Sequence, residues 1–171
     1  QTGIGRTGRW FAYQHEDILP DVVTLAKALA NGVPIGALGA RGAAATVLTP
    51  GTHASTFGGN PLATTAALFT LRTLADAGLV DRAGELGARA MAKLREAARR
   101  LPVIQEVRGR GLMIGVQLAA GAAEVARRCR EQGLLVNAIG DRVIRLLPPL
   151  VVRDGELDAG LEILTGAIAS L

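Results

Sequence analysis

Residues 20–36 read PDVVTLAKALANGVPIG and place one lysine, Lys27, between apolar neighbours. The run at residues 22–26 is short, apolar and rich in β-branched side chains, which predicts a buried strand that ends at the lysine. A loop marked by glycine and proline follows. Lysines in apolar surroundings form Schiff bases with carbonyl compounds, but a lysine at a strand end can also hold its ammonium group in water. On this stretch alone, the second interpretation is the simpler one.

Composition narrows the class of protein. The chain has 171 residues, 49% of them hydrophobic and 20% charged, which is typical of a globular protein. No apolar run approaches the roughly 18–20 residues of a membrane span, so we expect no membrane association. The net charge is +4, but aromatic residues make up only 3% of the chain, too few for stacking on bases, so we expect no nucleic-acid partner. The single Cys129 argues against disulfides and zinc sites and favours a reducing, cytoplasmic location.

The chain begins with Gln1 rather than Met, and it opens inside a glycine motif, QTGIGRTGR. Gly3, Gly5 and Gly8 have the spacing of a dinucleotide-binding loop, but that motif needs a strand before it and a helix after it. The sequence WFAY that follows is a poor start for a helix. We therefore expect a tight loop beside an active site, in a chain that is part of a longer protein.

Residues 53–61 read HASTFGGNP and combine hydroxyl groups with a pair of glycines. Ser55 and Thr56 offer hydroxyl donors and the glycines offer backbone amides, a combination that suits an anion. Asn60 before Pro61 is also a good helix N-cap. The two interpretations are compatible, because a capped helix start beside hydroxyl groups can itself hold an anion.

Two helices are predicted in the middle of the chain, at residues 61–77 and 79–101, with Gly78 between them. The second helix carries an apolar stripe at helical spacing. Its members are Leu79, Ala83, Leu86, Ala90, Leu94, Ala97 and Leu101. On the opposite face we expect the i,i+4 ion pairs Glu85–Arg89 and Glu96–Arg100.

The chain contains only two lysines, Lys27 and Lys93. Lys93 lies in the second helix but outside its apolar stripe, so we expect its ammonium group in water. Lys27 is therefore the only credible amine nucleophile of this chain.

The hydrophobic period changes after residue 101 and predicts an α+β unit. Strands are expected at residues 103–108, 112–118, 134–137 and 143–147, and helices at 122–131 and 155–170, with Asp154 as the cap of the last helix. We place a domain boundary near Gly78. Arg145 lies in an apolar strand, where an unpaired guanidinium is costly. It must meet either a protein carboxylate or a substrate carboxylate, and its neighbours leave both open.

Together these stretches resemble the C-terminal half of the class III aminotransferases, which are pyridoxal-phosphate enzymes of fold type I, and within them the acetylornithine aminotransferase branch. The matching segments are QTGIGRTG (1–8), PDVVTLAKAL (20–29), VPIGA (33–37), STFGGNPLA (55–63), VRGRGLM (107–113), LLVN (134–137) and VIRLLPPL (143–150). They span nearly the whole chain and keep the family's order and spacing.

The resemblance implies an α/β fold and an activity. Residues 1–78 would form the C-terminal part of the cofactor-binding large domain, and residues 79–171 the small α+β domain. The enzyme would be a homodimer with shared active sites. It would transfer the terminal amino group of N-acetylornithine to 2-oxoglutarate in two stages.

The resemblance also implies roles for single residues. Lys27 matches the catalytic lysine that holds pyridoxal 5'-phosphate as a Schiff base and later moves a proton. Gln1 matches a glutamine that donates to the phenolic oxygen of the cofactor. Thr56, together with Ser55, matches the contact to the cofactor phosphate of the neighbouring subunit. Arg145 matches the arginine that binds the substrate α-carboxylate, and no residue matches a metal ligand.

The chain departs from the family pattern at Ala54, where the family has a glycine and where an alanine would be strained at positive φ. The aspartate that pairs with the pyridine nitrogen, the upstream phosphate loop, the ring-stacking aromatic and a second carboxylate-binding arginine have no match. We therefore expect the chain alone to have little or no activity.

Two alternative functions stay open. One is another ω-amino transaminase acting on ornithine, succinyl-diaminopimelate or 4-aminobutyrate. The other is an inactive remnant or dimerisation module with an open sheet edge.

Overall fold

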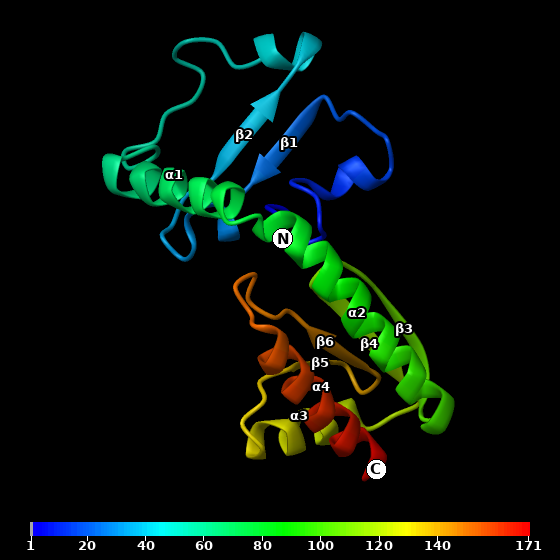
Figure 1. Cartoon of the computed structure of the whole chain (residues 1–171). Coiled ribbons are helices and arrows are strands. Elements are labelled where there is room, and N and C mark those ends of the chain that lie inside the picture. Colours follow the sequence, from blue (N-terminus) through cyan, green and yellow to red (C-terminus); the bar gives the residue numbers. More distant parts are fainter. Residues whose placement is uncertain (1) are drawn as a thin grey trace.

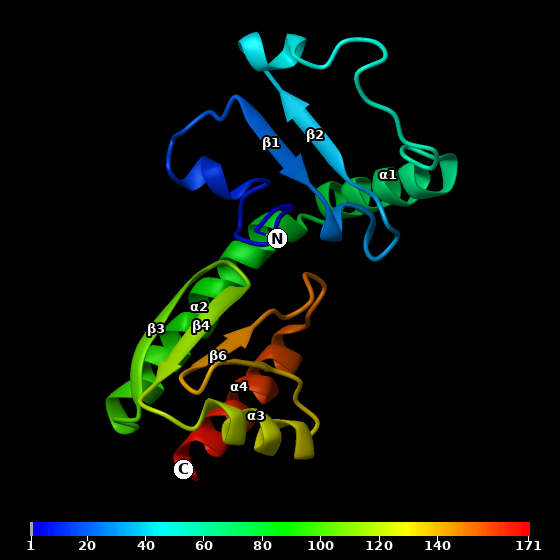
Figure 2. The ribbon, with the colours of Figure 1, turned by 180° about the vertical axis from the view of Figure 1, so that it is seen from behind.

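The computed structural model describes residues 2–171 (Figure 1). Within them, the α-helices are α1 (Pro61–Asp76), α2 (Leu79–Arg100), α3 (Ala122–Glu131) and α4 (Asp154–Ala169). The strands are β1 (Val22–Leu25), β2 (Ala37–Ala40), β3 (Ile104–Arg110), β4 (Met113–Leu118), β5 (Asn137–Ile139) and β6 (Val143–Leu146). Short 3-10 helices occupy Ala12–His15, Lys27–Ala30 and Gly42–Thr46. Figures 1 and 2 show β1, β2 and α1 at one end of the molecule and the other strands with α3 and α4 at the opposite end.

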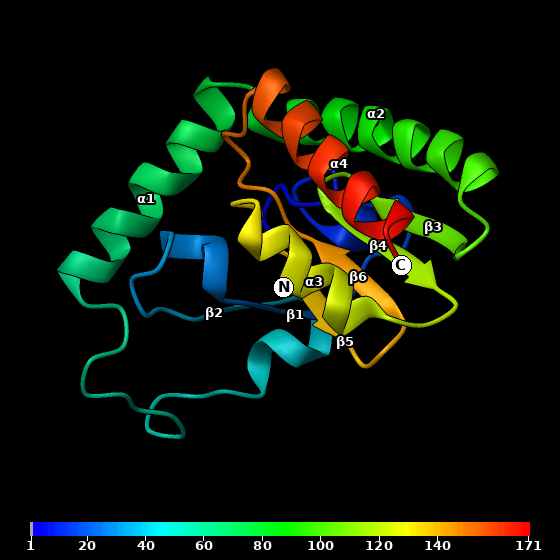
Figure 3. The same cartoon turned by 90° about the horizontal axis from the view of Figure 1, so that it is seen from below.

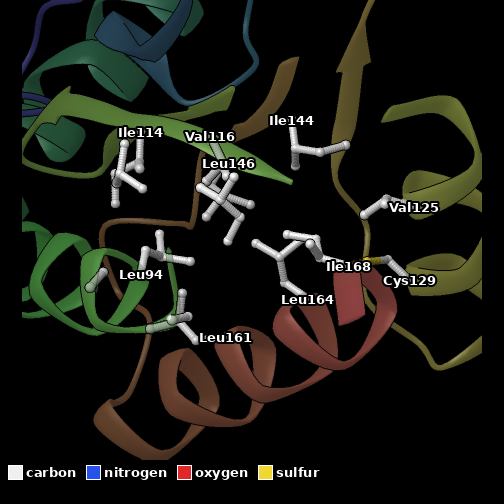
Figure 4. Close-up of a cluster of buried hydrophobic side chains, with 14 of the residues drawn as sticks. Leu94, Ile114, Val116, Val125, Cys129, Ile144, Leu146, Leu161, Leu164 and Ile168 are labelled. Carbon is white, nitrogen blue, oxygen red and sulfur yellow. The ribbon is translucent and has the colours of Figure 1, made fainter. Parts of the chain in front are cut away.

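The larger sheet has the order β3-β4-β6-β5, and all its neighbours are antiparallel. The helices α2, α3 and α4 pack together on one side of it (Figure 3). Side chains such as Leu94, Ile114, Ile144 and Leu164 meet there and are fully buried (Figure 4). Burying one such side chain stabilises the fold by about 1.5–3 kcal/mol. The core therefore fixes this face of the sheet and leaves the opposite face to build a site.

The apolar stripe predicted for α2 is confirmed. Every member from Leu79 to Ala97 is buried, and Leu101, just after the helix, is half-buried. From Ala83 onward the stripe faces β3, β4 and α4, whereas Leu79 belongs to the smaller cluster.

The ion pairs predicted along α2 are wrong. The observed pairs are Arg82–Asp154 (3.1 Å), Arg89–Asp154 (2.6 Å), Lys93–Asp158 (2.8 Å) and Arg99–Glu96 (2.8 Å). Most of them join α2 to α4, because the neighbouring helix offers carboxylates within reach. Hydrogen bonds from Arg82 and Arg89 lower the pKa of the Asp154 carboxyl. Asp154 is the first residue of α4 and Arg153 is its N-cap, so the predicted capping role of Asp154 is wrong as well.

The start of α1 is as predicted. The Oδ1 atom of Asn60 accepts a hydrogen bond from the backbone N–H of Ala63 at 3.0 Å, and Pro61 is the first helical residue. Asn60 thus satisfies one of the free N–H groups that every helix start exposes.

The strand predicted at residues 134–137 starts only at its last residue, Asn137. Gly133 has a φ of 83°, and the backbone N–H of Leu134 donates to the carbonyl of Cys129 at 2.8 Å. Residues 133–136 therefore form the exit from α3. This shift places Asn137 opposite Arg145 on β6.

The smaller region contains β1, β2 and α1. Its buried side chains Ile4, Leu29, Ala67 and Leu74 form a second cluster, and the half-buried Leu150 packs against both this cluster and the main core. The prediction of a buried strand before the lysine is wrong: Val22 is 47% exposed, because β1 pairs only with β2 within residues 2–171. The smaller cluster ends at residue 79 and the main core starts at residue 83, but the division into domains 1–78 and 79–171 stays a prediction.

The described part of the chain contains no helix that could cross a membrane. None of the helices within residues 2–171 combines the length and the apolar character that crossing a bilayer requires.

Candidate active site

Lys27 is the first residue of the 3-10 helix that follows β1, and its backbone has a φ of 49°. This left-handed conformation is uncommon for a residue other than glycine. The buried Leu29 and Ala30 anchor the same turn against α1. The side chain of Lys27 is exposed and has no ion-pair partner among residues 2–171. The turn thus fixes the lysine backbone and leaves its amine free to react.

The glycine segment before β1 packs closely against the backbones of α2 and of the turn between β3 and β4. A Cβ atom on Gly8 would lie 2.7 Å from the Cα atom of Gly84 in α2, and one on Gly111 would lie 2.5 Å from the carbonyl carbon of Thr7. Only glycines allow the backbones to approach this closely. The segment follows no strand within the described residues and leads into a 3-10 helix, so it lacks the surroundings of a dinucleotide loop. The prediction of a tight loop is confirmed.

Arg6 ties this segment to the larger sheet. Its Nη1 atom donates to the carbonyl of Leu112 at 3.2 Å and to the carbonyl of Pro148. The backbone N–H of Leu112 donates back to the carbonyl of Arg6 at 3.0 Å. Burial lowers the pKa of the Arg6 guanidinium. These bonds hold the glycine segment beside the turn between β3 and β4.

A cavity of about 690 Å³ lies between residues 2–16 and the face of the larger sheet that points away from the core. Tyr13 and Glu16 line it from the first segment, and Met113 and Arg145 from the sheet. Glu16 is paired with Arg110 across the two walls, with 2.6 Å between Oε1 and Nη2. The first segment and the sheet therefore build one wall each of a shared site.

Arg145 is half-buried on β6 and lines this cavity. Its Nη2 atom donates to Oδ1 of Asn137 at 3.2 Å. Its Nε atom is buried and has no hydrogen-bond partner among the described residues. No carboxylate within residues 2–171 pairs with Arg145, so the first of the two sequence alternatives, a protein carboxylate, is not what the structure shows. A half-buried guanidinium with free terminal N–H groups suits an incoming carboxylate.

The loop with Ser55 and Thr56 is exposed and lies away from this cavity. The Oγ atom of Ser55 accepts from the backbone N–H of Gly58 at 3.0 Å. Ala54 is not among the residues with positive φ, so the expected strain does not arise. In Figures 1 and 2 the connection between β2 and α1 lies at the end of the molecule opposite β6.

A family model for class III aminotransferases matches residues 1–168. The chain belongs to this family. It is 51% identical to acetylornithine aminotransferase 1 of Bordetella bronchiseptica over 98% of this chain and 43% of that protein, and 54% identical to acetylornithine aminotransferase of Gloeobacter violaceus over 100% of this chain and 43% of that protein. The chain thus spans less than half the length of these relatives.

Solved aminotransferase structures share the fold. The acetylornithine aminotransferase of Elizabethkingia anophelis matches with a TM-score of 0.94 at 36% identity. The match covers 100% of this chain and 44% of that protein's chain. The ornithine aminotransferase of Toxoplasma gondii matches with a TM-score of 0.93 at 40% identity. This match covers 99% of this chain and 42% of that protein's chain. The α/β fold type predicted from the sequence is confirmed.

Class III aminotransferases depend on pyridoxal phosphate, and the residues of this chain fit that cofactor in kind. Lys27 offers an exposed amine without an ion-pair partner within residues 2–171, and the loop at Ser55 offers hydroxyl groups and glycine amides. Arg145 lines the cavity and offers terminal N–H groups that pair with no carboxylate within residues 2–171. This chain holds the three groups in separate places, since neither Lys27 nor the loop lines the cavity of Arg145. Gln1 lies outside the described residues.

The sequence did not reveal three features of this candidate site. They are the Arg6 tie, the Glu16–Arg110 pair and the contact of Asn137 with Arg145. The first two join distant segments and leave no local pattern. The third could have been found, because Asn137 and Arg145 lie symmetrically about the turn at residues 140–142, as partners in a hairpin do.

Proposed function

We propose that this chain works as the C-terminal part of an acetylornithine aminotransferase. The observation that carries amino transfer is the guanidinium of Arg145 on the cavity, which pairs with no carboxylate within residues 2–171 and suits the carboxylate of an amino-acid substrate. The choice of N-acetylornithine as substrate is supported by the 50–54% sequence identity to relatives named acetylornithine aminotransferase. By "assembled enzyme" we mean this chain together with the other parts of such an aminotransferase.

Lys27 is the proposed catalytic residue. Its Nζ atom would hold the cofactor covalently and, once the substrate has displaced it, would take up and return the substrate proton. Bound pyridoxal phosphate supplies the electron sink for this chemistry. The exposed position of Lys27 and its lack of an ion pair within residues 2–171 support the role. We also propose that Gln1 donates to the phenolic oxygen of the cofactor.

The remaining proposals concern assembly. The loop of Ser55 and Thr56 does not line the cavity, which supports a homodimer in which this loop serves the cofactor phosphate of the neighbouring subunit. Arg145 would bind the α-carboxylate of N-acetylornithine and then that of 2-oxoglutarate. Residues 1–78 would belong to the cofactor-binding large domain and residues 79–171 to the small domain. We propose a cytoplasmic location.

The amino donor tests the proposed substrate. In the assembled enzyme with 2-oxoglutarate as acceptor, we expect kcat/KM for N-acetylornithine to exceed that for ornithine, succinyl-diaminopimelate and 4-aminobutyrate by about tenfold or more. Steady-state assays with each donor measure this directly. Preference for ornithine would favour the other ω-amino transaminase, and absence of turnover with N-acetylornithine would remove our first choice.

A further inference from the structure

Four residues form one row across the larger sheet. Arg108 on β3 is paired with Gly115 on β4, Gly115 with Arg145 on β6, and Arg145 with Asn137 on β5. Partners in antiparallel strands project from the same face of the sheet. The residues that alternate with them, such as Ile114 and Ile144, point into the core (Figure 4). The row therefore lies on the opposite face, where the cavity is.

The two arginines of this row differ in whether their guanidinium groups are already paired with a carboxylate. The Nη1 atom of Arg108 donates to Oε2 of Glu106 at 2.6 Å and to Oε1 of Gln117 at 2.9 Å. Its charge is thus already paired with a carboxylate. Arg145 contacts no carboxylate within residues 2–171, and its one hydrogen bond there goes to the neutral amide of Asn137. Arg145 is the arginine of the row that is held in place but not neutralised.

This arrangement suits recognition of a carboxylate. A guanidinium has five N–H donors, and the bond to Asn137 takes one of them. The terminal N–H groups that Asn137 does not occupy stay available for a two-pronged contact with a carboxylate, whereas the Nε–H is buried. A long arginine side chain loses much rotamer freedom when it is fixed in one orientation. A neighbour that fixes it beforehand removes part of that cost from ligand binding.

We propose that Asn137 is a positioning residue: it fixes the guanidinium of Arg145 so that its free N–H groups face the substrate carboxylate. This inference rests on the proposed function of Arg145. The register of β5 and β6 places Asn137 directly opposite Arg145, and the amide oxygen accepts without adding a charge that would compete with the substrate.

The test uses the assembled enzyme loaded with cofactor. For Asn137→Ala we expect KM for 2-oxoglutarate to rise about tenfold, as for loss of a hydrogen bond to a charged group, with kcat within about twofold. Asn137→Asp, which keeps the oxygen but adds a negative charge beside Arg145, should raise KM at least as much. The thermal midpoint and the absorption spectrum of the bound cofactor should not change.

Gln117→Ala is the matched control. It also removes an amide that accepts from an arginine on the same face, but that arginine stays paired with Glu106. We expect its KM for 2-oxoglutarate to stay within about twofold of the wild type, because the guanidinium of Arg145 is untouched.

A double-mutant cycle separates this inference from the proposed function. Arg145→Ala should raise KM about 100-fold or more, and Asn137→Ala should add nothing in that background, because it acts through Arg145. An unchanged KM in Arg145→Ala would overturn the proposed function itself. A large effect of Arg145→Ala together with an unchanged KM in Asn137→Ala, or with additive effects in the double variant, would overturn the positioning role alone.

Discussion

Lys27→Ala should lower kcat of the assembled enzyme by at least about 10³-fold, because the side chain would both hold the cofactor and move the substrate proton. Lys27 begins the turn after β1, exposed and without an ion pair within residues 2–171, so we expect its replacement to leave the fold intact. Single-turnover assays at saturating N-acetylornithine separate this loss from weaker binding of substrate.

Lys93→Ala is the control for this variant, since it removes the other lysine of the chain. Lys93 is half-exposed on α2, and its Nζ atom lies 2.8 Å from Oδ1 of Asp158. An exposed pair of this kind contributes little to stability. We expect normal turnover from Lys93→Ala. The role of Lys27 would be refuted by a Lys27→Ala enzyme with turnover within tenfold of the wild type.

Gly87→Ala should destabilise the protein by about 3 kcal/mol, at the upper end of the usual cost of overpacking. Within a helix, alanine normally stabilises relative to glycine by up to about 1 kcal/mol. At this position a Cβ atom would lie 2.0 Å from the carbonyl oxygen of Gly111, in the turn between β3 and β4. That turn is backbone held by the Arg6 tie, so it cannot withdraw easily. The midpoint of urea unfolding measures the change.

Gly84→Ala, one helical turn earlier, provides the comparison. A Cβ atom there would lie 3.5 Å from the Cα atom of Gly8, an ordinary van der Waals contact. We expect Gly84→Ala to be as stable as the wild type or slightly more stable. Equal stability of the two variants would show that the joint between α2 and Gly111 is looser than the structure indicates.

Local patterns predicted the elements that depend on local interactions. The stripe of α2, the bounds of α3 and the capping of α1 by Asn60 were all readable, because periodicity and caps are encoded by residues three or four apart. The same reasoning failed for Arg89, whose partner lies 65 residues away on α4. An ion pair within a helix and one between helices leave the same signature in the sequence.

Burial and register were the other failures. The apolar run of β1 suggested a buried strand, but burial depends on which elements cover it, and only β2 pairs with it among residues 2–171. The start of β5 was misplaced because the apolar residues after Gly133 belong to the exit from α3. That error of three residues concealed the pairing of Asn137 with Arg145. The sequence pointed to Lys27 as an amine nucleophile and to Arg145 as a residue that binds a carboxylate. It did not reveal that Tyr13 and Glu16 form a wall of the cavity.

The central claim is that Lys27 carries the cofactor, and reduction with borohydride tests it most directly. The assembled enzyme is incubated with pyridoxal phosphate, reduced, digested and analysed by peptide mass spectrometry. Because this chain has only two lysines, the adduct can be assigned without ambiguity within it. We predict a pyridoxyl group on the peptide that contains Lys27 and none on the peptide that contains Lys93. A label on Lys93 alone, or no label on either peptide, would contradict the claim.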